Sequence, residues 1–526
     1  MFLKKIPKFI LRRMQYDKAV RLGYTPIPLK NGGAVVGIGK HMGKKEIIYY
    51  VDEDIHTLCI GATRSGKTRT VVLQSVGLQG LSGESMINCD PKAELYQYTA
   101  PFLKRLGYEV IAIDFKSPLK STRYNFLQNV INAVNEKDIP KAIDYTWDIT
   151  TSLVGEAKGE RIWNDGEASI IAAAILAVVI ENKHTPQFQN LTNVYYFISE
   201  MCRAVGNSLP INKYMKELPQ DHPARGLLGI SEVAPSKTRG SFFTAALTTL
   251  RLFTNPLIYS MTSTTDFDID TTGSTKRAIF IILPDEKVTY YSLASLFVSQ
   301  HYETLVKVAD ERGGRLKNRV NYNLDEFGNF TVIPAFANKL TVGGGRGIRF
   351  NLYLQSFAQL DEKYGKENAK TVKSNCQTWI YLQADDLETL EELSKKLGNY
   401  TVSTCSQSSS YSKGSSAVNT STSANLTGRA LLTVDEIRLV SRPYSIITSR
   451  ENPCVMYAPD LSKCIFNKMF GLGDKEHNRM VREEREKKRP QRNSDVEMEL
   501  WGIWNKFNGS ADDYFSTFDE QFKNKV

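Results

Sequence analysis

The stretch GATRSGKT constrains the fold more strongly than any other part of this 526-residue sequence. It matches the pattern G-x-x-x-x-G-K-[ST] at every fixed position. A largely apolar run, His56–Ile60, leads directly into it, and the segment Arg69–Leu78 can continue as a helix. A strand, a glycine-containing loop and a helix in this order are the context of a phosphate-binding loop. We expect this loop to consist of Gly61, Ala62, Thr63, Arg64, Ser65, Gly66, Lys67 and Thr68.

Each part of the loop has a predicted task. Glycines at 61 and 66 allow the backbone N–H groups to turn inward around phosphate oxygens. The helix that follows adds its positive N-terminal end. Lys67 is expected to reach the β and γ phosphates, and Thr68 to hold Mg²⁺. The predicted cofactors are therefore ATP and Mg²⁺.

Hydrolysis needs carboxylates from a second strand, and Asp325-Glu326 directly follows the strand-like run Val320–Leu324. Asp325 would support Mg²⁺, while Glu326 would orient and deprotonate the attacking water. The alternative is an ordinary acidic pair at the surface. Because 258 residues separate Lys67 from Asp325, a further region must lie between the two motifs.

Two more candidates lie downstream. Gln355 ends the strand-like run 350–354, and the carboxyl end of a parallel strand points toward the ligand edge of a sheet. It could report the γ phosphate or be an ordinary strand-end residue. Arg346 and Arg349 adjoin the run Gly343–Gly345, so either could act as an arginine finger in a neighbouring subunit. The alternative is a basic loop that faces solvent or nucleic acid.

The order of elements predicts an α/β fold with a mostly parallel sheet and an all-α insertion. Further strand candidates lie at 84–89, 108–114 and 278–283, whereas the region from about 140 to 235 has a helical pattern. The apolar run 170–180 is too short for a bilayer and predicts a buried helix. The predicted divisions are an N-terminal segment 1–30, a nucleotide-binding domain 31–140 and 236–465, an insertion 141–235, and a charged tail 466–526.

Three other segments have a distinct character. The N-terminal segment is basic and amphipathic, so it could lie on an anionic membrane or dock as a helix on the protein itself. The serine-rich stretch 403–423 predicts a flexible loop. The charged run 479–492 predicts a solvated helix or linker.

The net charge of +10 is compatible with a nucleic acid or membrane partner. The seven scattered cysteines form no C-x-x-C pair, which disfavours a zinc site or a disulfide framework and favours a reducing cytosol. The absence of an H-R-D motif disfavours a protein kinase.

Several stretches together resemble the coupling proteins of type IV secretion, the conjugative transfer ATPases. The resemblance covers roughly residues 30–455. It rests on GATRSGKT, DPKAEL at 90–95, LDEFGN at 324–329, RGIR at 346–349, LQSFAQL at 354–360 and the segment around Asn375. Asp90, Lys92 and Glu94 within DPKAEL follow a strand that could lie beside the loop strand, which would place them near the nucleotide. A simple turn before a helix is the alternative.

The resemblance implies a RecA-like motor that works as a homo-hexamer. It also implies DNA, relaxase and relaxosome proteins, and type IV secretion channel proteins as partners. Most family members begin with transmembrane helices, and this sequence does not. We therefore expect a separate membrane-anchor protein and a cytoplasmic location at the inner face of the membrane.

Two other functions remain open at this point. One is a cargo receptor whose nucleotide site only controls assembly. The other is a double-stranded DNA translocase of the chromosome-segregation type, although those proteins typically carry a C-terminal winged helix and this tail is polar, with Trp501 and Trp504.

Overall fold

The computed structural model describes residues 12–15, 29–40, 46–155, 159–205, 208–284, 286–411, 418–450 and 452–507. The chain divides into two compact units. The first consists of Met1–Met86, Asn321–Gly328 and Leu340–Asn478, and the second of Ile87–Val320, Asn329–Lys339 and Arg479–Val526.

A sheet forms the centre of the first unit. Its strand order is β14-β13-β10-β4-β9-β8, in which β4 pairs in parallel with both β10 and β9, while β13 and β14 are antiparallel. Strand β4 is buried along its whole length, as expected for an apolar strand between two neighbours. The strands span Thr57–Gly61 (β4), Val320–Leu324 (β8), Ile348–Leu354 (β9), Thr378–Gln383 (β10), Tyr444–Thr448 (β13) and Cys454–Tyr457 (β14).

The helices of the first unit include the one that starts at the phosphate loop. A π-helical turn, η1 (Thr68–Val72), leads into α2 (Leu73–Ser82), which ends at Gly83 in the left-handed conformation. The other helices are α14 (Phe357–Asn375), α15 (Leu387–Leu397), α16 (Val434–Arg438) and α17 (Ile465–Met469). Helix α13 (Phe336–Gly343) spans the division between the units.

A buried amide network fixes α2 on the sheet. Gln79 of α2 and Asn323 of β8 exchange two hydrogen bonds, of 3.2 and 2.8 Å. Asn351 of β9 donates a third to Asn323 at 2.9 Å. All three side chains are buried, so each needs these partners. The network sets the helix after the loop against the strands that carry the other candidate site residues.

The N-terminal prediction meets the structure only at residues 12–15. These form a strand, β1 (Arg12–Gln15), and not part of a helix. It pairs with β3 (Glu46–Val51), which also pairs with β2 (Ala34–Lys40), in a small antiparallel sheet. The rest of the segment 1–28 lies outside the described residues, so its attachment to a membrane stays a prediction.

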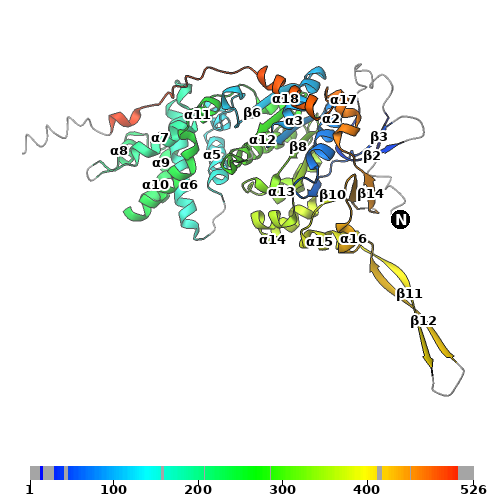
Figure 1. Ribbon diagram of the computed structural model, residues 1–526. Coiled ribbons are helices and arrows are strands. Elements are labelled where there is room, and N and C mark those ends of the chain that lie inside the picture. The colour runs from blue at the N-terminus through cyan, green and yellow to red at the C-terminus, as the bar shows by residue number, and fades with distance from the viewer. Residues whose placement is uncertain are drawn as a thin grey trace, which may run out of the picture. The chain divides into compact units, whose positions relative to one another are not determined.

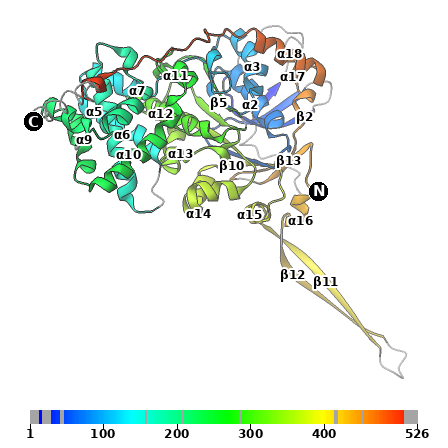
Figure 2. The ribbon, with the colours of Figure 1, turned by 60° about the vertical axis from the view of Figure 1, so that its left-hand side comes forward.

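Residues 403–411 and 418–423 of the serine-rich stretch lie in two paired strands, so the prediction of a flexible loop was wrong for them, while 412–417 lie outside the described residues. Strands β11 (Asn399–Tyr411) and β12 (Val418–Ala430) pair in unbroken antiparallel register. They extend away from α15 and α16 (Figures 1 and 2). Threonine and valine favour extended backbone, and cross-strand contacts such as Ser406 Oγ to Ser423 Oγ at 2.7 Å replace a hydrophobic face.

The second unit contains three strands in the order β5-β7-β6, with β6 and β7 parallel. Their bounds are Ser85–Asp90 (β5), Glu109–Asp114 (β6) and Arg277–Ile282 (β7). The mostly parallel α/β architecture predicted from the sequence is thus confirmed. The longer helices are α3 (Glu94–Arg105), α4 (Gln128–Asn135), α5 (Ile139–Val154), α6 (Arg161–Glu181), α7 (Leu191–Met201), α8 (Pro210–Glu217), α9 (Pro223–Glu232), α10 (Ser236–Leu250), α11 (Pro256–Thr262) and α12 (Tyr291–Glu311).

Helices α6 to α9 fall within the predicted insertion 141–235, α5 overlaps its start, and α6 is their centre. Helix α6 packs against α5, α7, α9 and α10, and its residues 170–179 are buried. By length and composition it is the one described helix that could cross a membrane, and 67% of its apolar window is buried inside the protein. The expectation of a buried helix is therefore confirmed, while the domain boundaries stay predictions.

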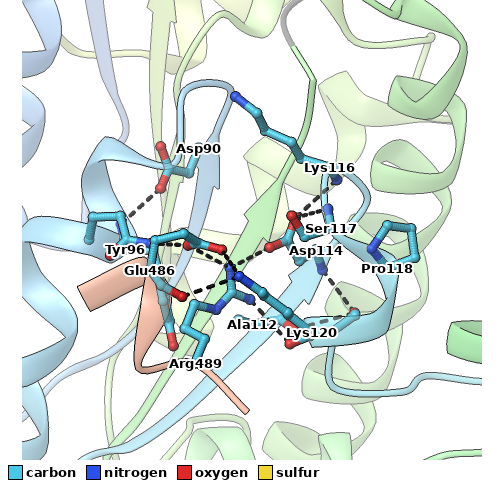
Figure 3. A network of polar contacts seen from close by, with 12 residues as sticks. Asp90, Tyr96, Ala112, Asp114, Lys116, Ser117, Pro118, Lys120, Glu486 and Arg489 are labelled. Carbon is cyan, nitrogen blue, oxygen red and sulfur yellow. Dashed lines mark hydrogen bonds and ion pairs between the residues drawn. The ribbon is translucent and has the colours of Figure 1, made fainter. Parts of the chain in front are cut away.

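The charged run 479–492 is helical up to Lys487, as predicted, but it is not simply solvated, because several of its side chains contact the second unit. Helix α18 (Lys475–Lys487) is followed by Arg489, whose guanidinium donates to Asp114 at 2.5 Å. Both side chains are buried, and the guanidinium also lies 4.8 Å from the ring centre of Tyr96 (Figure 3). Glu486 pairs with Lys120 at 2.7 Å. Charged side chains of the run 479–492 therefore form specific ion pairs at the carboxyl end of β6.

Candidate nucleotide-binding site

The phosphate loop connects β4 to η1 within the first unit. Arg64 and Gly66 both have left-handed backbone, with φ of 67° and 90°. Glycine adopts this conformation without cost, whereas an arginine there is strained, and such strain concentrates at functional sites. Ala62 N–H donates to the Gln383 carbonyl at 2.6 Å, which ties the start of the loop to β10. The loop is thus held in a wound conformation by the sheet.

Lys67 and Ser65 point into the loop. Lys67 is buried, and its Nζ donates to the Gly61 carbonyl at 2.5 Å. The Ser65 hydroxyl is buried and has no hydrogen-bond partner in the described part of the protein. A buried ammonium and an unsatisfied hydroxyl inside a wound backbone fit a phosphate group, because phosphate oxygens accept from both.

Thr68 and Asp325 come together as predicted from the sequence. The Thr68 hydroxyl donates to Asp325 Oδ2 at 2.8 Å, although 257 residues separate them. Burial, together with the charge of Glu326, raises the pKa of Asp325 to about 6, although the hydrogen bond from Thr68 and the charge of Lys67 oppose the change. A hydroxyl beside a buried carboxylate at this place suits Mg²⁺, which prefers oxygen ligands.

Glu326, Gln355 and Thr63 form one chain of side-chain hydrogen bonds. Gln355 Nε2 donates to Glu326 Oε2 at 2.9 Å, and the Thr63 hydroxyl donates to Gln355 Oε1 at 3.1 Å. The backbone of Glu326 has a φ of 53°, which is strained for this residue. The amide of Gln355 therefore connects the candidate base to the phosphate loop, a contact that sequence spacing alone did not predict.

The two candidate arginines differ in position. Arg349 is buried within β9 and forms an ion pair with Glu84, and its Nη1 donates to the Gly32 carbonyl at 3.1 Å. An arginine held this way cannot reach a neighbouring subunit, so the expectation of a finger at Arg349 was wrong. Arg346 lies in the turn η8 (Gly344–Arg346) and is partly exposed. Its role as a finger stays a prediction.

Sequence analysis missed two arginines beside the loop. Arg442 Nε donates to the Ser65 carbonyl at 2.6 Å, and a Cβ on Gly66 would lie 3.0 Å from the Arg442 guanidinium carbon. Arg69 forms a two-pronged ion pair with Asp460, at 2.7 and 2.9 Å. Neither arginine belongs to a motif, and each connects the loop region to a residue more than 370 positions away in sequence.

The DPKAEL residues belong to the second unit. Asp90 Oδ2 accepts from Tyr96 N–H at 2.8 Å, which supports the start of α3. Glu94 pairs with Arg482 at 3.3 Å, and Arg482 also donates to the Lys92 carbonyl. These contacts tie the motif to α18. The expectation that the motif lies near the nucleotide stays a prediction.

The phosphate loop after β4 and the paired carboxylates after β8 define a phosphate-loop protein with a RecA-like α/β fold. The chain belongs to the family described as "Type IV secretory system Conjugative DNA transfer", whose model matches residues 18–459. The resemblance stated from the sequence motifs is thereby confirmed.

Among characterised relatives, "Protein VirD4" of Rhizobium radiobacter is 25% identical over 405 residues, which cover 76% of this chain and 56% of that protein. "Conjugal transfer protein TraG" of Escherichia coli is 25% identical over 363 residues, covering 66% of this chain and 55% of that protein. The chain therefore spans a little more than half the length of these relatives.

Solved structures of the plasmid coupling protein TrwB share the fold. The complex with the ATP analogue ADPNP aligns with a TM-score of 0.59 and 17% identity, covering 87% of this chain and 96% of that chain. The complex with ADP and Mg²⁺ aligns with a TM-score of 0.58 and 17% identity, with the same coverage. At this identity the likeness concerns the fold.

Proposed function

We propose that this protein is an ATP-hydrolysing coupling protein, which delivers DNA and relaxase cargo to a type IV secretion channel during conjugative transfer. Family membership supports the process, and the relatives named VirD4 and TraG support the type of protein. The observation that carries the ATPase proposal is the pair of contacts from the loop to the two carboxylates, Thr68 to Asp325 and Thr63 through Gln355 to Glu326.

ATP and Mg²⁺ fit the residues present. Lys67 and the loop backbone would hold the phosphates, and Thr68 with Asp325 would hold the metal directly or through water. Bound Mg²⁺ supplies neutralisation of the charge that develops on the phosphates. The TrwB structures with ADPNP and with ADP and Mg²⁺ support this choice of nucleotide and metal.

Glu326 is proposed as the general base. It accepts a hydrogen bond from Gln355, which leaves the other carboxylate oxygen to accept a proton from water. Gln355 contacts Thr63 of the loop as well, so a change in the loop would move the amide that positions the base. By this route the presence of a γ phosphate would set the orientation of Glu326.

The active form is proposed to be a homo-hexamer, in which Arg346 of one subunit contributes to the site of the next. Its partial exposure in the turn after α13 supports this role. The other proposed partners are DNA, relaxosome proteins and the channel proteins of the secretion system, at the cytoplasmic face of the membrane.

The test is the ATPase rate of the purified chain with single-stranded DNA, with double-stranded DNA and without DNA. We expect DNA to stimulate turnover. We expect Glu326→Gln to lower turnover by at least a hundredfold while nucleotide binding stays within a few-fold, since a general base contributes about 10²–10⁴. Glu362→Gln, an exposed carboxylate on α14, is the matched control and should keep full activity.

The alternatives give different results. Tight nucleotide binding without turnover, in the presence of both DNA and relaxase, would replace the motor by a nucleotide-gated cargo receptor. Stimulation by double-stranded DNA alone, with no response to relaxase, would favour the double-stranded DNA translocase. Unchanged turnover in Glu326→Gln would remove Glu326 as the base.

A further inference from the structure

The C-terminal segment Asp495–Phe507 packs against helices of the second unit as a largely extended chain. It follows α18 as an extended chain and forms a single turn, η10 (Ile503–Lys506), near its end. Figures 1 and 2 show the chain running from α18 to the helices α7 and α8, where η10 lies. Up to Gly502 the segment has no helix or strand of its own, so its backbone groups bind side chains of the body or water.

Two buried side chains, Asn193 and Tyr259, form hydrogen bonds with the backbone of this segment. Asn193 of α7 donates from Nδ2 to the Glu499 carbonyl at 3.1 Å and accepts from Trp501 N–H at 2.8 Å. The Tyr259 hydroxyl accepts from Glu499 N–H at 3.2 Å. An amide that binds a carbonyl and an N–H two residues apart reads an extended peptide without regard to its side chains.

Asn193 is pre-positioned for this contact. It is fully buried, and its backbone N–H and its Nδ2 both donate to Asn190 Oδ1, the residue that caps α7. With the segment in place, the Oδ1 and Nδ2 of Asn193 both bind its backbone. The contacts with Asn190 therefore orient this amide for an extended chain.

An aromatic slot adjoins the backbone grip. The ring of Trp501 stacks on Phe197, with ring centres 5.8 Å apart and planes at 17°, and meets the edge of Tyr214 at 6.2 Å. Phe507 also meets Tyr214 edge to face, with ring centres 5.6 Å apart. An occupant of this site therefore needs one large aromatic side chain, two residues after the residue (here Glu499) whose carbonyl binds Asn193.

The part of the segment before Glu499 is at least partly exposed, whereas Trp504 and Phe507 are buried. The side chains of Asp495, Glu497 and Glu499 are exposed. An open pocket of about 720 Å³, lined by residues such as Gln128, Ile131 and Gln187, adjoins residues 492–499. This part of the segment is therefore not packed on all sides.

We propose that these residues form a peptide-binding groove and that Asp495–Phe507 is its built-in occupant. The ligand is an extended segment of a partner protein. It carries an aromatic residue two positions after the residue whose carbonyl accepts from Asn193. Such a partner binds only when the chain's own segment leaves, because a tethered occupant acts at an effective concentration near the millimolar range. The proposal does not depend on nucleotide hydrolysis.

The test uses full-length protein and a fluorescent peptide with the sequence of residues 493–507. Trp501→Ala in the protein weakens the tethered segment, so we expect the peptide to bind this variant at least tenfold more tightly than the wild type in an anisotropy titration. Trp163→Ala, a partly exposed tryptophan on α6, is the control protein and should behave like wild type. A peptide with alanine in place of tryptophan should not bind.

Two added substitutions locate the binding. In the Trp501→Ala protein, Asn193→Ala should weaken the peptide at least tenfold and Tyr259→Phe by a smaller factor, since it removes one hydroxyl. Thermal unfolding of each variant checks that it is folded. Equal peptide affinity for wild type and the Trp501→Ala protein would overturn the proposal, as would no binding to a folded Trp501→Ala protein.

A second measurement needs no variant. In wild-type protein, a large excess of the peptide should raise the hydrogen-exchange rate of the amides of Glu499 and Trp501, because their acceptors are then occupied by the competitor. Rates that stay constant up to millimolar peptide would contradict the groove.

Discussion

The phosphate loop and the C-terminal groove solve opposite recognition problems. In the loop, the backbone of the protein turns its N–H groups toward a ligand, helped by left-handed residues such as Gly66. In the groove, side chains such as Asn193 turn toward the backbone of a peptide. The first arrangement needs a short, special stretch of sequence. The second needs residues from several helices that are distant in sequence.

This difference explains why the two sites tolerate change differently. A backbone site fails when the local conformation changes, even though no side chain is lost. A side-chain site fails when one of its anchors loses its partner. Substitutions at the two sites and around them test this contrast.

We expect the largest loss of stability when the ion pair between Arg489 and Asp114, which holds the C-terminal segment on the second unit, is broken. Arg489→Met leaves Asp114 buried without its partner, and breaking a buried ion pair costs roughly 3–5 kcal/mol. We expect this loss in the free energy of unfolding, measured by urea denaturation. Adding Asp114→Asn to the variant should restore part of it.

The matched control is an exposed pair near the end of the same segment. Lys506 and Glu217 are 2.6 Å apart, and their side chains are 63% and 53% exposed. Lys506→Met should cost less than about 1 kcal/mol, because solvent screens the pair. Equal losses for the two substitutions would contradict a buried anchor at Arg489.

Gly66→Ala tests the backbone site. Its φ of 90° is strained for alanine, and the new Cβ would lie 3.0 Å from the Arg442 guanidinium. We expect nucleotide affinity to fall about a hundredfold, or about 2.7 kcal/mol, by calorimetry. Gly229→Ala is the control, because a Cβ there meets nothing within 4 Å. A Gly66→Ala protein with normal affinity would show that the loop conformation is not required.

The pH dependence of stability should report His56, which lies just before the loop strand. Burial lowers the pKa of His56 to about 4, and its ring nitrogens contact the Leu340 carbonyl at 2.6 Å and Phe350 N–H at 3.0 Å. The unfolded state therefore takes up the proton first, and stability is lost as the pH falls from about 6.5 to 4. At pH 5 the loss from this group is about 2 kcal/mol.

The measurement compares wild type with His56→Gln, which keeps a neutral polar group at this position. Urea denaturation at pH 7 and pH 5 should show a steeper loss for wild type, by about 2 kcal/mol. If both proteins lose the same stability over this interval, His56 is not held neutral.

The smallest effect is expected at the contact that joins the loop to the candidate base. Gln355→Ala removes the amide between Thr63 and Glu326 without removing either. We expect turnover about tenfold lower, or about 1.4 kcal/mol in the barrier, with nucleotide affinity nearly unchanged. Gln407→Ala on the exposed hairpin is the control. A change in affinity alone would assign Gln355 to binding.

The nucleotide site was largely predictable because its parts are local. The loop is eight consecutive residues, and Asp325 with Glu326 follows a recognisable strand. The buried strands β4, β5, β6, β7, β8 and β9 all lie close to where apolar runs predicted them. Arg442 could not be predicted, because only the folded sheet brings it to a loop 377 residues earlier.

The other failures have physical reasons as well. The hairpin β11–β12 lacks the apolar alternation that marks a half-buried strand, since none of its described side chains is buried. The run 479–492 looked solvated because charged residues are usually exposed. Here Arg489 meets the buried Asp114, a pairing across 375 positions that leaves no trace in local composition.

The segment between the two anchors has a practical consequence. Residues 493–495 are exposed and irregular, while Arg489 and Arg492 hold the chain on one side and Trp501 and Trp504 on the other. A protease that cut here would turn the tethered segment into a free ligand, so its binding would then depend on protein concentration. The nicked molecule would run as two bands on a denaturing gel, and dilution before a native gel would separate the pieces, so covalent continuity and structural integrity must be measured separately in this protein.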